Sequence, residues 1–481
     1  MSEATKDLKE KLFNAKKNGV DVMSDEELRR CDDFCEGYKE FLQENKTERE
    51  VAAWIEMMAA EYRFRPFDVY KEDVGYYDRR RLPGDRCDMM PGDRIYYANR
   101  GKSVILCTLG RRPVSDGVRI AAAHIDSPRL DLKQCPVYEQ EGIGYFKTHY
   151  YGGIKKFQWV AIPLSLHGRI FRADGSYVDV KLGEEPGEPK FCITDILPHL
   201  GGEQMARKAN EIVKGEELNV VIGSRPFKDD EESERIKLNI LALLNDKYDI
   251  VERDFLSAEL ELVPAFTVDD IGFDRSMIGG YGHDDRVCSY PALQAIFDVR
   301  GIPEYTAITV LTDKEEIGSD GNTGLKSAYL KYFIEDLAKM SGCEGRDVLR
   351  NSKCLSADVN AAYDPTWSSV FEKNNASVIN GGVCVTKFTG SRGKGGTSDA
   401  SAEFCSWVRR LFDDNGVHWQ TGELGKVDAG GGGTVAMYIA NLDVDTIDVG
   451  VPVLSMHAPY EIVSKIDVYQ AYKAFLTFFT K

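Results

Sequence analysis

Two glutamates, Glu315 and Glu316, stand side by side in the segment TDKEEIGSDGNTG, directly after the apolar run YTAITVLT. Neighbouring side chains of a regular strand point to opposite faces, so two adjacent carboxylates seldom share one task. If the chain leaves the extended conformation after Asp313, one glutamate can bind a metal ion while the other acts as a general base. The residues alone leave open which glutamate has which task.

Four further apolar runs end in residues that bind metals well. In open α/β sheets, functional sites gather at the carboxyl ends of the strands, so these residues are expected to converge. A set of two histidines with several carboxylates suits zinc, cobalt or manganese better than calcium or magnesium. The residues are His124 and Asp126 after IAAAHID, Asp284 and Asp285 in YGHDDR, Asp358 after CLSADV, and His457 after PVLSMH.

Two neighbouring metal ions need a carboxylate that bridges them and an independent pair of ligands for each ion, and this inventory is sufficient. His124 and Asp126 lie on the same face of an extended segment, so Asp126 can hydrogen-bond the imidazole and orient it. Each element also has an ordinary alternative, because strand-end histidines are often structural and paired acids often begin a helix or fill a turn. Five independent structural explanations in this order are less economical than one metal site.

The segments that carry these residues alternate with helical patterns. Short β-rich runs such as VRIAAAHID, KCLSADV and DTIDVGVPVLSMH alternate with helical segments such as DRVCSYPALQAIFDV and LKSAYLKYFIEDLAKM. This alternation predicts an α/β fold with a central sheet flanked by helices on both faces. Residues 5–62 are helical in period, and Ser24 followed by Glu27 predicts a capped helix start.

Residues 131–263 break the alternation with glycine-punctuated β runs such as FQWVAIPLSLHGRIFRADGSYVDVKLG. Hairpins within an α/β chain indicate an inserted second domain. We therefore predict a catalytic domain formed by residues 1–130 and 264–481, with a β-rich domain, residues 131–263, inserted between its two parts. A chain of 481 residues is long enough for two or three domains.

Composition narrows the class of protein. The chain has 43% hydrophobic and 29% charged residues, which is typical of a soluble globular protein, and its net charge of −17 argues against a nucleic-acid partner. There is no apolar run of membrane-spanning length and no secretory signal pattern, so no membrane partner is expected. The eleven cysteines form no CxxC pair and suggest reduced thiols in a cytoplasmic protein.

Two glycine-rich segments, GSRGKGGTSDA and DAGGGGTVAMYIA, superficially resemble phosphate-binding loops. Neither contains the P-loop pattern, and neither has the full dinucleotide-binding fingerprint with its acidic partner. We expect instead that their backbone lies close to a substrate cleft, where free N–H groups can orient a substrate.

The segments AAAHIDSPRLDLK, DDRVCSYPALQA, TDKEEIGSDGNTG, SADVNAAYDP and DVGVPVLSMHAPYE resemble, in this order, those of the aspartyl and vacuolar aminopeptidases, metallopeptidase family 18. The resemblance extends over nearly the whole chain from about residue 60. It implies a mixed central sheet of the di-zinc exopeptidase type, an inserted β-rich dimerisation domain, and a homododecamer built from dimers.

The resemblance also implies a role for each residue of the constellation. Asp284 would be the bridging carboxylate, although an exchange of roles with Asp285 stays open. Glu315 would be the general base, with Asp126 behind the metal ligand His124. The implied ligands are His124 and Glu316 for one ion, and Asp358 and His457 for the other.

The implied function is hydrolysis of the N-terminal residue from short peptides, with two divalent ions activating a water molecule and Glu315 taking its proton. Zinc is the first choice of metal, with cobalt or manganese as alternatives. Two other functions remain open at this point: a di-metal amidohydrolase or deacylase that acts on N-acyl amino acids, and a catalytically silent assembly scaffold.

The chain departs from the family pattern in ways that bear on specificity. Phe157 stands where many members have a histidine that reaches a neighbouring subunit's active site, and DVNAAYDP lacks the histidines that often follow the second-metal aspartate. We therefore expect a preference for neutral or basic N-terminal residues. An acidic residue would need a cation in the pocket, and the candidates are Lys155, Lys156, Arg392 and Lys394.

Overall fold

The computed structural model describes residues 3–14, 16–67, 89–228 and 233–481. Its largest element is a nine-stranded mixed sheet whose four central strands, β14, β4, β15 and β19, run parallel. The order across the sheet is β1 (Arg65–Pro66), β2 (Arg94–Asn99), β3 (Ser103–Thr108), β14 (Thr306–Thr312), β4 (Val118–His124), β15 (Lys353–Ser356), β19 (Asp445–Gly450), β17 (Val383–Thr386) and β18 (Trp419–Thr421).

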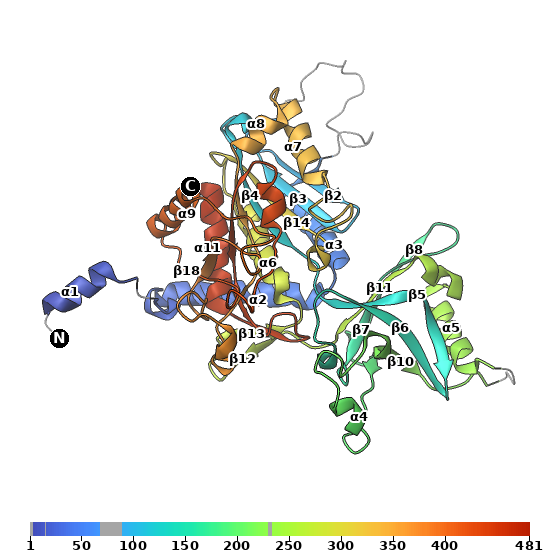
Figure 1. Ribbon diagram of the computed structural model, residues 1–481. Coiled ribbons are helices and arrows are strands. Elements are labelled where there is room, and N and C mark those ends of the chain that lie inside the picture. The colour runs from blue at the N-terminus through green and yellow to red at the C-terminus, as the bar shows by residue number, and fades with distance from the viewer. Residues whose placement is uncertain (1–2, 15, 68–88, 229–232) are drawn as a thin grey trace, which may run out of the picture.

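Helices cover both faces of this central sheet, which confirms the predicted fold class (Figure 1). In β4, Ala121 and Ala123 face one hydrophobic layer while Ile120 and Ala122 face the other, because successive side chains of a strand alternate. The first layer contains α2 (Asp25–Glu44), α3 (Glu48–Glu61), α6 (His283–Phe297), α9 (Ala402–Asp414) and α11 (Lys465–Thr480). The second contains α7 (Tyr329–Met340), α8 (Gly345–Arg350) and α10 (Ala436–Ala440).

Side-chain caps define where several helices begin. The Ser24 hydroxyl accepts the N–H of Glu27 at the start of α2, as the sequence predicts. Thr47 and Glu50 form a reciprocal capping box at the start of α3, so α2 and α3 are separate helices that meet at a corner. The short helix α1 (Glu3–Leu12) projects away from the rest of the molecule (Figure 1).

A second sheet lies beside the central one and is antiparallel throughout. Its order is β8 (Tyr177–Leu182), β7 (Leu164–Phe171), β11 (Glu259–Pro264), β5 (Arg129–Gln140), β6 (Ile143–Tyr151), β10 (Asn219–Gly223) and β9 (Cys192–Ile193). Together with α4 (Gly202–Met205) and α5 (Arg235–Tyr248) it forms a lobe with its own hydrophobic core. We call residues 129–264 the β-rich lobe; its role in dimerisation stays a prediction.

A smaller third sheet supports the site. Its order is β12 (Asp269–Ile271), β13 (Met277–Gly280), β21 (Glu461–Ser464), β20 (Pro452–Leu454) and β16 (Asn360–Ala361). The single β run predicted from DTIDVGVPVLSMH is therefore divided between β19 and β20 in different sheets. The chain leaves the central sheet at Gly450, where a Cβ atom would lie 1.7 Å from the carbonyl oxygen of Asp358, so only glycine permits this approach.

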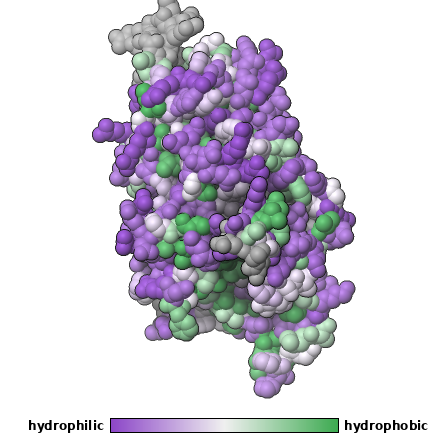
Figure 2. Space-filling view, turned by 90° about the vertical axis from the view of Figure 1, so that its left-hand side faces the viewer, coloured by the Kyte–Doolittle hydropathy of each residue, from purple (hydrophilic) through white to green (hydrophobic). Residues whose placement is uncertain are grey.

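Seven short 3₁₀ turns complete the described chain: Gly19–Asp21, Val114–Asp116, Lys156–Gln158, Gly215–Glu217, Glu252–Ser257, Glu315–Ile317 and Pro365–Val370. No helix among the described residues combines the length and apolar character needed to cross a membrane. Figure 2 views the molecule from the left-hand side of Figure 1, and this face is mostly hydrophilic with hydrophobic patches in its middle and lower part.

Candidate metal centre

The predicted constellation comes together where strands of the central sheet end. His124 is the last residue of β4, and Asp358 follows β15 by two residues. Asp284 lies at the start of α6, where the Asp284–Asp285 peptide bond is cis. The Glu315–Glu316 pair follows β14, and His457 follows β20. Five segments that are far apart in the sequence thus supply one cluster of ligand atoms.

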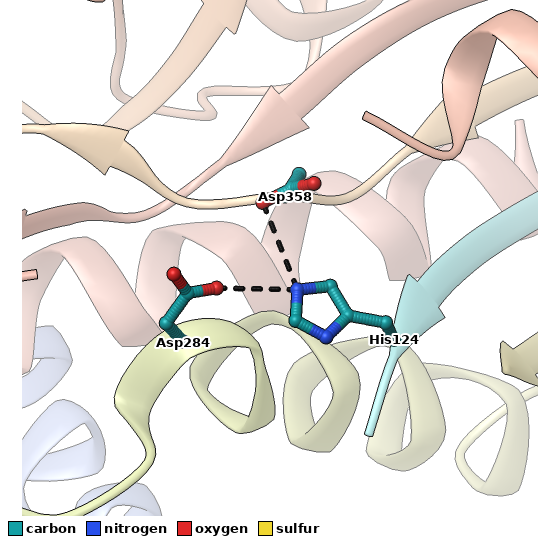
Figure 3. A group of neighbouring side chains, drawn as sticks. All are labelled: His124, Asp284 and Asp358. Atoms are coloured by element: carbon teal, nitrogen blue, oxygen red, sulfur yellow. Dashed lines mark hydrogen bonds and ion pairs between the residues drawn. The ribbon is translucent and has the colours of Figure 1, made fainter. Parts of the chain in front are cut away.

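One group of ligand atoms is formed by His124, Asp284 and Asp358 (Figure 3). The Nε2 atom of His124 lies 3.2 Å from Oδ1 of Asp284 and 4.0 Å from Oδ1 of Asp358. All three side chains point toward one another, and their ligand atoms lie within 4.8 Å of each other.

A second group is formed by Asp284, Glu316 and His457. The Nε2 atom of His457 lies 3.1 Å from Oδ2 of Asp284 and 3.8 Å from Oε2 of Glu316. Asp284 therefore belongs to both groups and turns a different oxygen toward each histidine. Asp285 is fully buried, and it belongs to neither of the two groups found among the described residues.

The structure pairs the remaining ligands differently from the family-based prediction, which paired His124 with Glu316 and Asp358 with His457. The predicted pairing is wrong, and the conformation of the turn after β14 explains the difference. Lys314 has a left-handed conformation with φ of 68°, and Glu315–Ile317 then forms a 3₁₀ turn. This turn carries Glu316 to the side of His457 and leaves Oε2 of Glu315 3.9 Å from Nε2 of His124.

Asp126 supports this turn as well as the imidazole of His124. Its carboxylate accepts the backbone N–H groups of Glu315 and Glu316 at 3.1 and 3.2 Å. The Nδ1 atom of His124 lies 3.0 Å from the Asp126 carbonyl oxygen and 3.3 Å from its carboxylate. The predicted orientation of the imidazole is therefore made mainly by the carbonyl, while the carboxylate fixes the paired glutamates.

Sequence reasoning missed Glu461, which lies four residues after His457 in the segment SMHAPYE. Its carboxylate accepts the backbone N–H of His457 at 2.7 Å and that of Asp284 at 3.1 Å. Glu461 is buried and therefore fixes two segments of the second group without facing the cavity. The only sign in the sequence was a glutamate close to a predicted ligand.

Without added positive charge, ionisation of most of the buried carboxylates in this cluster is unfavourable. Burial raises the pKa of Glu315 to about 7 and raises the pKa values of Glu316 and Asp358 well above the usual range. Burial acts in the same sense on Asp284, but hydrogen bonds with His124 and His457 outweigh it and lower the pKa of that carboxyl. A cation in each group would stabilise the ionised carboxylates.

The residues fit a pair of divalent ions. Each group offers one imidazole nitrogen and carboxylate oxygens, a donor set that suits zinc, cobalt or manganese. Oε1 of Glu316 is buried and has no hydrogen-bond partner, as expected of an oxygen reserved for a ligand. Asp284 supplies the shared carboxylate that two neighbouring ions require.

A cavity of about 1190 Å³ opens onto this cluster. Both glycine-rich segments line it, through Gly395 and Gly396 and through Gly431–Gly433, which confirms their predicted place at a cleft. Asp448 also faces it, accepts a hydrogen bond of 2.8 Å from the Thr434 hydroxyl, and was not predicted.

The four candidate cations differ in position. Lys155 is the only lysine or arginine among the described residues that line the cavity. Lys156 donates to the carbonyl oxygen of Asn210, and Lys394 pairs with Asp399 at 2.7 Å. Arg392 is exposed and does not line the cavity. Large apolar side chains complete the wall: Trp367, Phe371, Leu424, Met437 and Met456.

Comparison with known proteins places these features in a family. Residues 41–479 match the family model described as aminopeptidase I zinc metalloprotease (M18). A probable M18 family aminopeptidase 1 of Clostridium acetobutylicum is 44% identical over 472 residues, covering 97% of this chain and 99% of that protein. The crystal structure of an M18 family aminopeptidase from Thermotoga maritima matches with a TM-score of 0.89 and 40% identity, covering 98% of this chain and 100% of that one.

A more distant solved structure shares the fold alone. The dodecamer of the Saccharomyces cerevisiae protein mApe1 matches with a TM-score of 0.73 and 21% identity, covering 94% of this chain and 97% of that one.

Proposed function

The chain belongs to the M18 family of zinc metalloproteases and is a metallo-aminopeptidase, and from that premise we propose how its own residues carry out the hydrolysis. The observation that supports the proposal is the membership of Asp284 in both groups of ligand atoms. Two divalent ions, zinc in the first place, would be held on either side of Asp284. The remaining ligands would be His124 and Asp358 for one ion, and Glu316 and His457 for the other.

The substrate is a short peptide with a free N-terminal residue. When bound, the two ions would supply Lewis-acid polarisation of the scissile carbonyl and would make a water molecule more acidic. Oε2 of Glu315 takes a proton from the attacking water and passes it to the leaving amide nitrogen, so the peptide bond breaks to a carboxylate and an amine. The Glu315 side chain is placed for this task because it lines the cavity but belongs to neither ligand group.

Asp126 and Glu461 have supporting roles in this scheme. Asp126 holds the backbone of the turn that carries Glu315 and Glu316, and Glu461 holds the backbone of Asp284 and His457. Neither carboxylate needs to touch the substrate. Both keep the reacting groups within the small tolerance that catalysis by positioning requires.

The proposed mechanism is tested by replacing Glu315 with glutamine. Glu315→Gln keeps the shape of the side chain but removes the proton acceptor, so kcat should fall by a factor of about 10² to 10⁴. Metal content should remain that of the unmodified protein. Asp320→Asn is the matched control, because Asp320 lies in the same loop but points outward to pair with Lys326. Unchanged turnover of Glu315→Gln on aminoacyl-p-nitroanilides would remove Glu315 from this role.

The preference for neutral or basic N-terminal residues remains our proposal for specificity. The apolar wall of the cavity, formed by residues such as Trp367, Met437 and Met456, favours an uncharged side chain. Among the described residues that line the cavity, Lys155 is the one cation that could attract an acidic residue. A panel of aminoacyl-p-nitroanilides should give lower kcat/KM for aspartyl and glutamyl substrates than for leucyl or lysyl ones. Efficient aspartyl hydrolysis that disappears in Lys155→Met would contradict the proposal.

We further propose that the protein is a cytoplasmic homododecamer built from dimers through the β-rich lobe. The dodecamer of the yeast protein mApe1 supports this arrangement because its subunits share the fold. Eleven cysteines without a CxxC pair support a reducing compartment. Light scattering should give a mass near twelve times the 53.9 kDa of one chain.

A further inference from the structure

We propose that Tyr151, the last residue of β6 in the β-rich lobe, is a positioning residue for the catalytic turn that carries Glu315 and Glu316. The Tyr151 hydroxyl holds Asp126, and Asp126 in turn holds the backbone of that turn. This inference rests on the proposed function, because it assigns Tyr151 a task in the same site. It also makes the β-rich lobe a necessary part of the active site within a single chain.

The contact between Tyr151 and Asp126 is direct and buried. The hydroxyl donates to Oδ2 of Asp126 at 2.8 Å, and the Tyr151 side chain is only 8% exposed. The same carboxylate accepts the N–H groups of Glu315 and Glu316. Three donors from two parts of the chain therefore converge on one carboxylate, and the hydroxyl is the only one that comes from the β-rich lobe.

This arrangement makes the hydroxyl important for geometry. A hydrogen bond to an ionised carboxylate is shorter and stronger than one between neutral groups, so each donor restricts the orientation of Asp126. If the hydroxyl is removed, the carboxylate can rotate, and the turn that depends on it gains freedom. A displacement of about 1 Å at a catalytic group is enough to cost roughly 10²-fold in rate.

Tyr151 is itself held firmly. It is paired in register with Arg129, the first residue of β5, and the guanidinium of Arg129 lies 3.9 Å from the centre of the tyrosine ring. Arg129 forms ion pairs of 3.3 Å with Glu48 of α3 and with Glu261 of β11. Arg129 thus connects the tyrosine ring both to the helical layer and to the β-rich lobe.

The residues that follow Tyr151 continue toward the metal ligands. Gly152 has φ of 77°, and a Cβ atom there would lie 3.1 Å from Oε2 of Glu316. The carbonyl oxygen of Gly153 lies 2.7 Å from Nδ1 of His457 and accepts a hydrogen bond from it. The exit of β6 therefore lies against two of the three ligand side chains of the second group, Glu316 and His457, and this gives the β-rich lobe a further contact with the site.

The test is Tyr151→Phe, which removes only the hydroxyl. Hydrogen exchange of the metal-free protein should show the amides of Glu315 and Glu316 exchanging about tenfold faster than in the unmodified protein. In the metal-loaded enzyme, kcat should fall by roughly 10 to 10² while KM changes less than about twofold.

Tyr281→Phe is the matched control. Tyr281 is 4% exposed, and its hydroxyl donates to the carbonyl oxygen of Pro128 at 2.9 Å, so the variant also loses one buried hydrogen bond close to the site. It should leave the two amides and kcat unchanged. Unchanged exchange in Tyr151→Phe, or an equal acceleration in Tyr281→Phe, would overturn the inference. The exchange experiment needs no activity, so its result stays separate from a failure of the proposed function.

Discussion

Glu461 holds two segments of the candidate metal site in place without lining the cavity. Its two carboxylate oxygens accept the backbone N–H groups of Asp284 and His457, which come from segments more than 170 residues apart in the chain. The carboxylate of Asp126 likewise accepts two backbone N–H groups, those of Glu315 and Glu316, in the turn after β14. In both cases a buried carboxylate fixes backbone, and the side chains on that backbone then have little freedom.

Replacement of Glu461 by glutamine should therefore weaken both folding and metal binding. The amide offers one acceptor and one donor, so one of the two backbone N–H groups would face another donor and lose its partner. The expected loss is about 1–3 kcal/mol of unfolding free energy, the usual effect of an unsatisfied buried group. Urea unfolding and metal titration of the metal-free protein measure the two effects. Glu335→Gln, which removes half of an exposed pair with Lys331, should change neither.

Metal stoichiometry distinguishes a shared ligand from an unshared one. Asp358 belongs to one group of ligand atoms and Asp284 to both, so their replacements should differ. Asp358→Asn should bind one ion tightly and lose the other, whereas Asp284→Asn should lose both. Metal analysis after gel filtration in buffer with a weak chelator gives the numbers directly. Two tightly bound ions in Asp284→Asn would instead assign the bridging role elsewhere, and Asp285→Asn would then be examined in the same way.

The sequence indicated the candidate ligand residues better than it indicated how they are grouped in space. His124, Asp358 and His457 could be singled out because each closes an apolar run with a side chain that binds metals. Their pairing depended on a left-handed residue and a 3₁₀ turn after β14, and no spacing rule predicts these. Glu461 and Tyr151 were missed for another reason: a side chain that supports a neighbour leaves no periodic pattern in the sequence.

At the scale of elements, the continuous apolar runs were the sequence feature that best predicted the helices and strands. VRIAAAHID became β4 and DRVCSYPALQAIFDV became α6, because central parallel strands are buried on both faces and α6, which is itself buried along nearly its whole length, packs on them. The division of DTIDVGVPVLSMH between two sheets was missed. The sheet that a short strand joins is decided by contacts such as that of Gly450 with Asp358, which hydrophobic periodicity does not contain.

The corner between α2 and α3 is joined to the β-rich lobe by a buried ionic network. His167 of β7 lies 2.7 Å from Glu50 and 3.0 Å from Glu184, and Lys46 lies 2.8 Å from Glu184. Burial alone would lower the pKa of His167, but hydrogen bonds to Glu184 and Glu50 outweigh it and raise that pKa. Burial opposes ionisation of Glu184 too, yet its bonds to His167 and Lys46 lower its pKa to about 2.

This network predicts a stability difference that depends on pH. The folded-state pKa of His167 is raised above its unfolded value of 6.5, so the stabilisation is complete below that value and is lost as pH rises through the raised pKa. The difference in unfolding free energy between the unmodified protein and His167→Gln should therefore be largest below about pH 6.5 and should shrink as the pH rises above that value. Parallel curves for the unmodified protein and His167→Gln would show that His167 is not charged in the folded state.

At the scale of the whole molecule, our proposals give two faces of the β-rich lobe different tasks. At its inner edge, at the end of β6, Tyr151 donates a hydrogen bond to Asp126, which in turn accepts the backbone N–H groups of Glu315 and Glu316. On α5, which lies at the far side of the lobe from the central sheet, Leu238 and Leu243 are 41% and 59% exposed (Figure 1). If the lobe contacts a second copy, as we propose, these two leucines make α5 a candidate for the contact, because contact surfaces between proteins contain exposed apolar area. A lobe that contacts a second copy on one side and the active site on the other would link assembly to catalysis.

A charge introduced on that helix should therefore reduce assembly. Leu243→Glu places a carboxylate where a partner chain would bury a leucine, and burial of an unpaired charge is costly, so the particle mass should fall from about twelve chains toward smaller species. Light scattering after size exclusion measures the mass, and hydrogen exchange of the Glu315–Glu316 amides in the smaller species then shows whether the lobe still holds the turn. Lys247→Glu changes charge on the same helix at a position that is already polar and exposed, so its mass should stay that of the unmodified protein. A full-size particle formed by Leu243→Glu would place the dimer contact on another face of the lobe, because a buried interface would not accept that carboxylate without a partner.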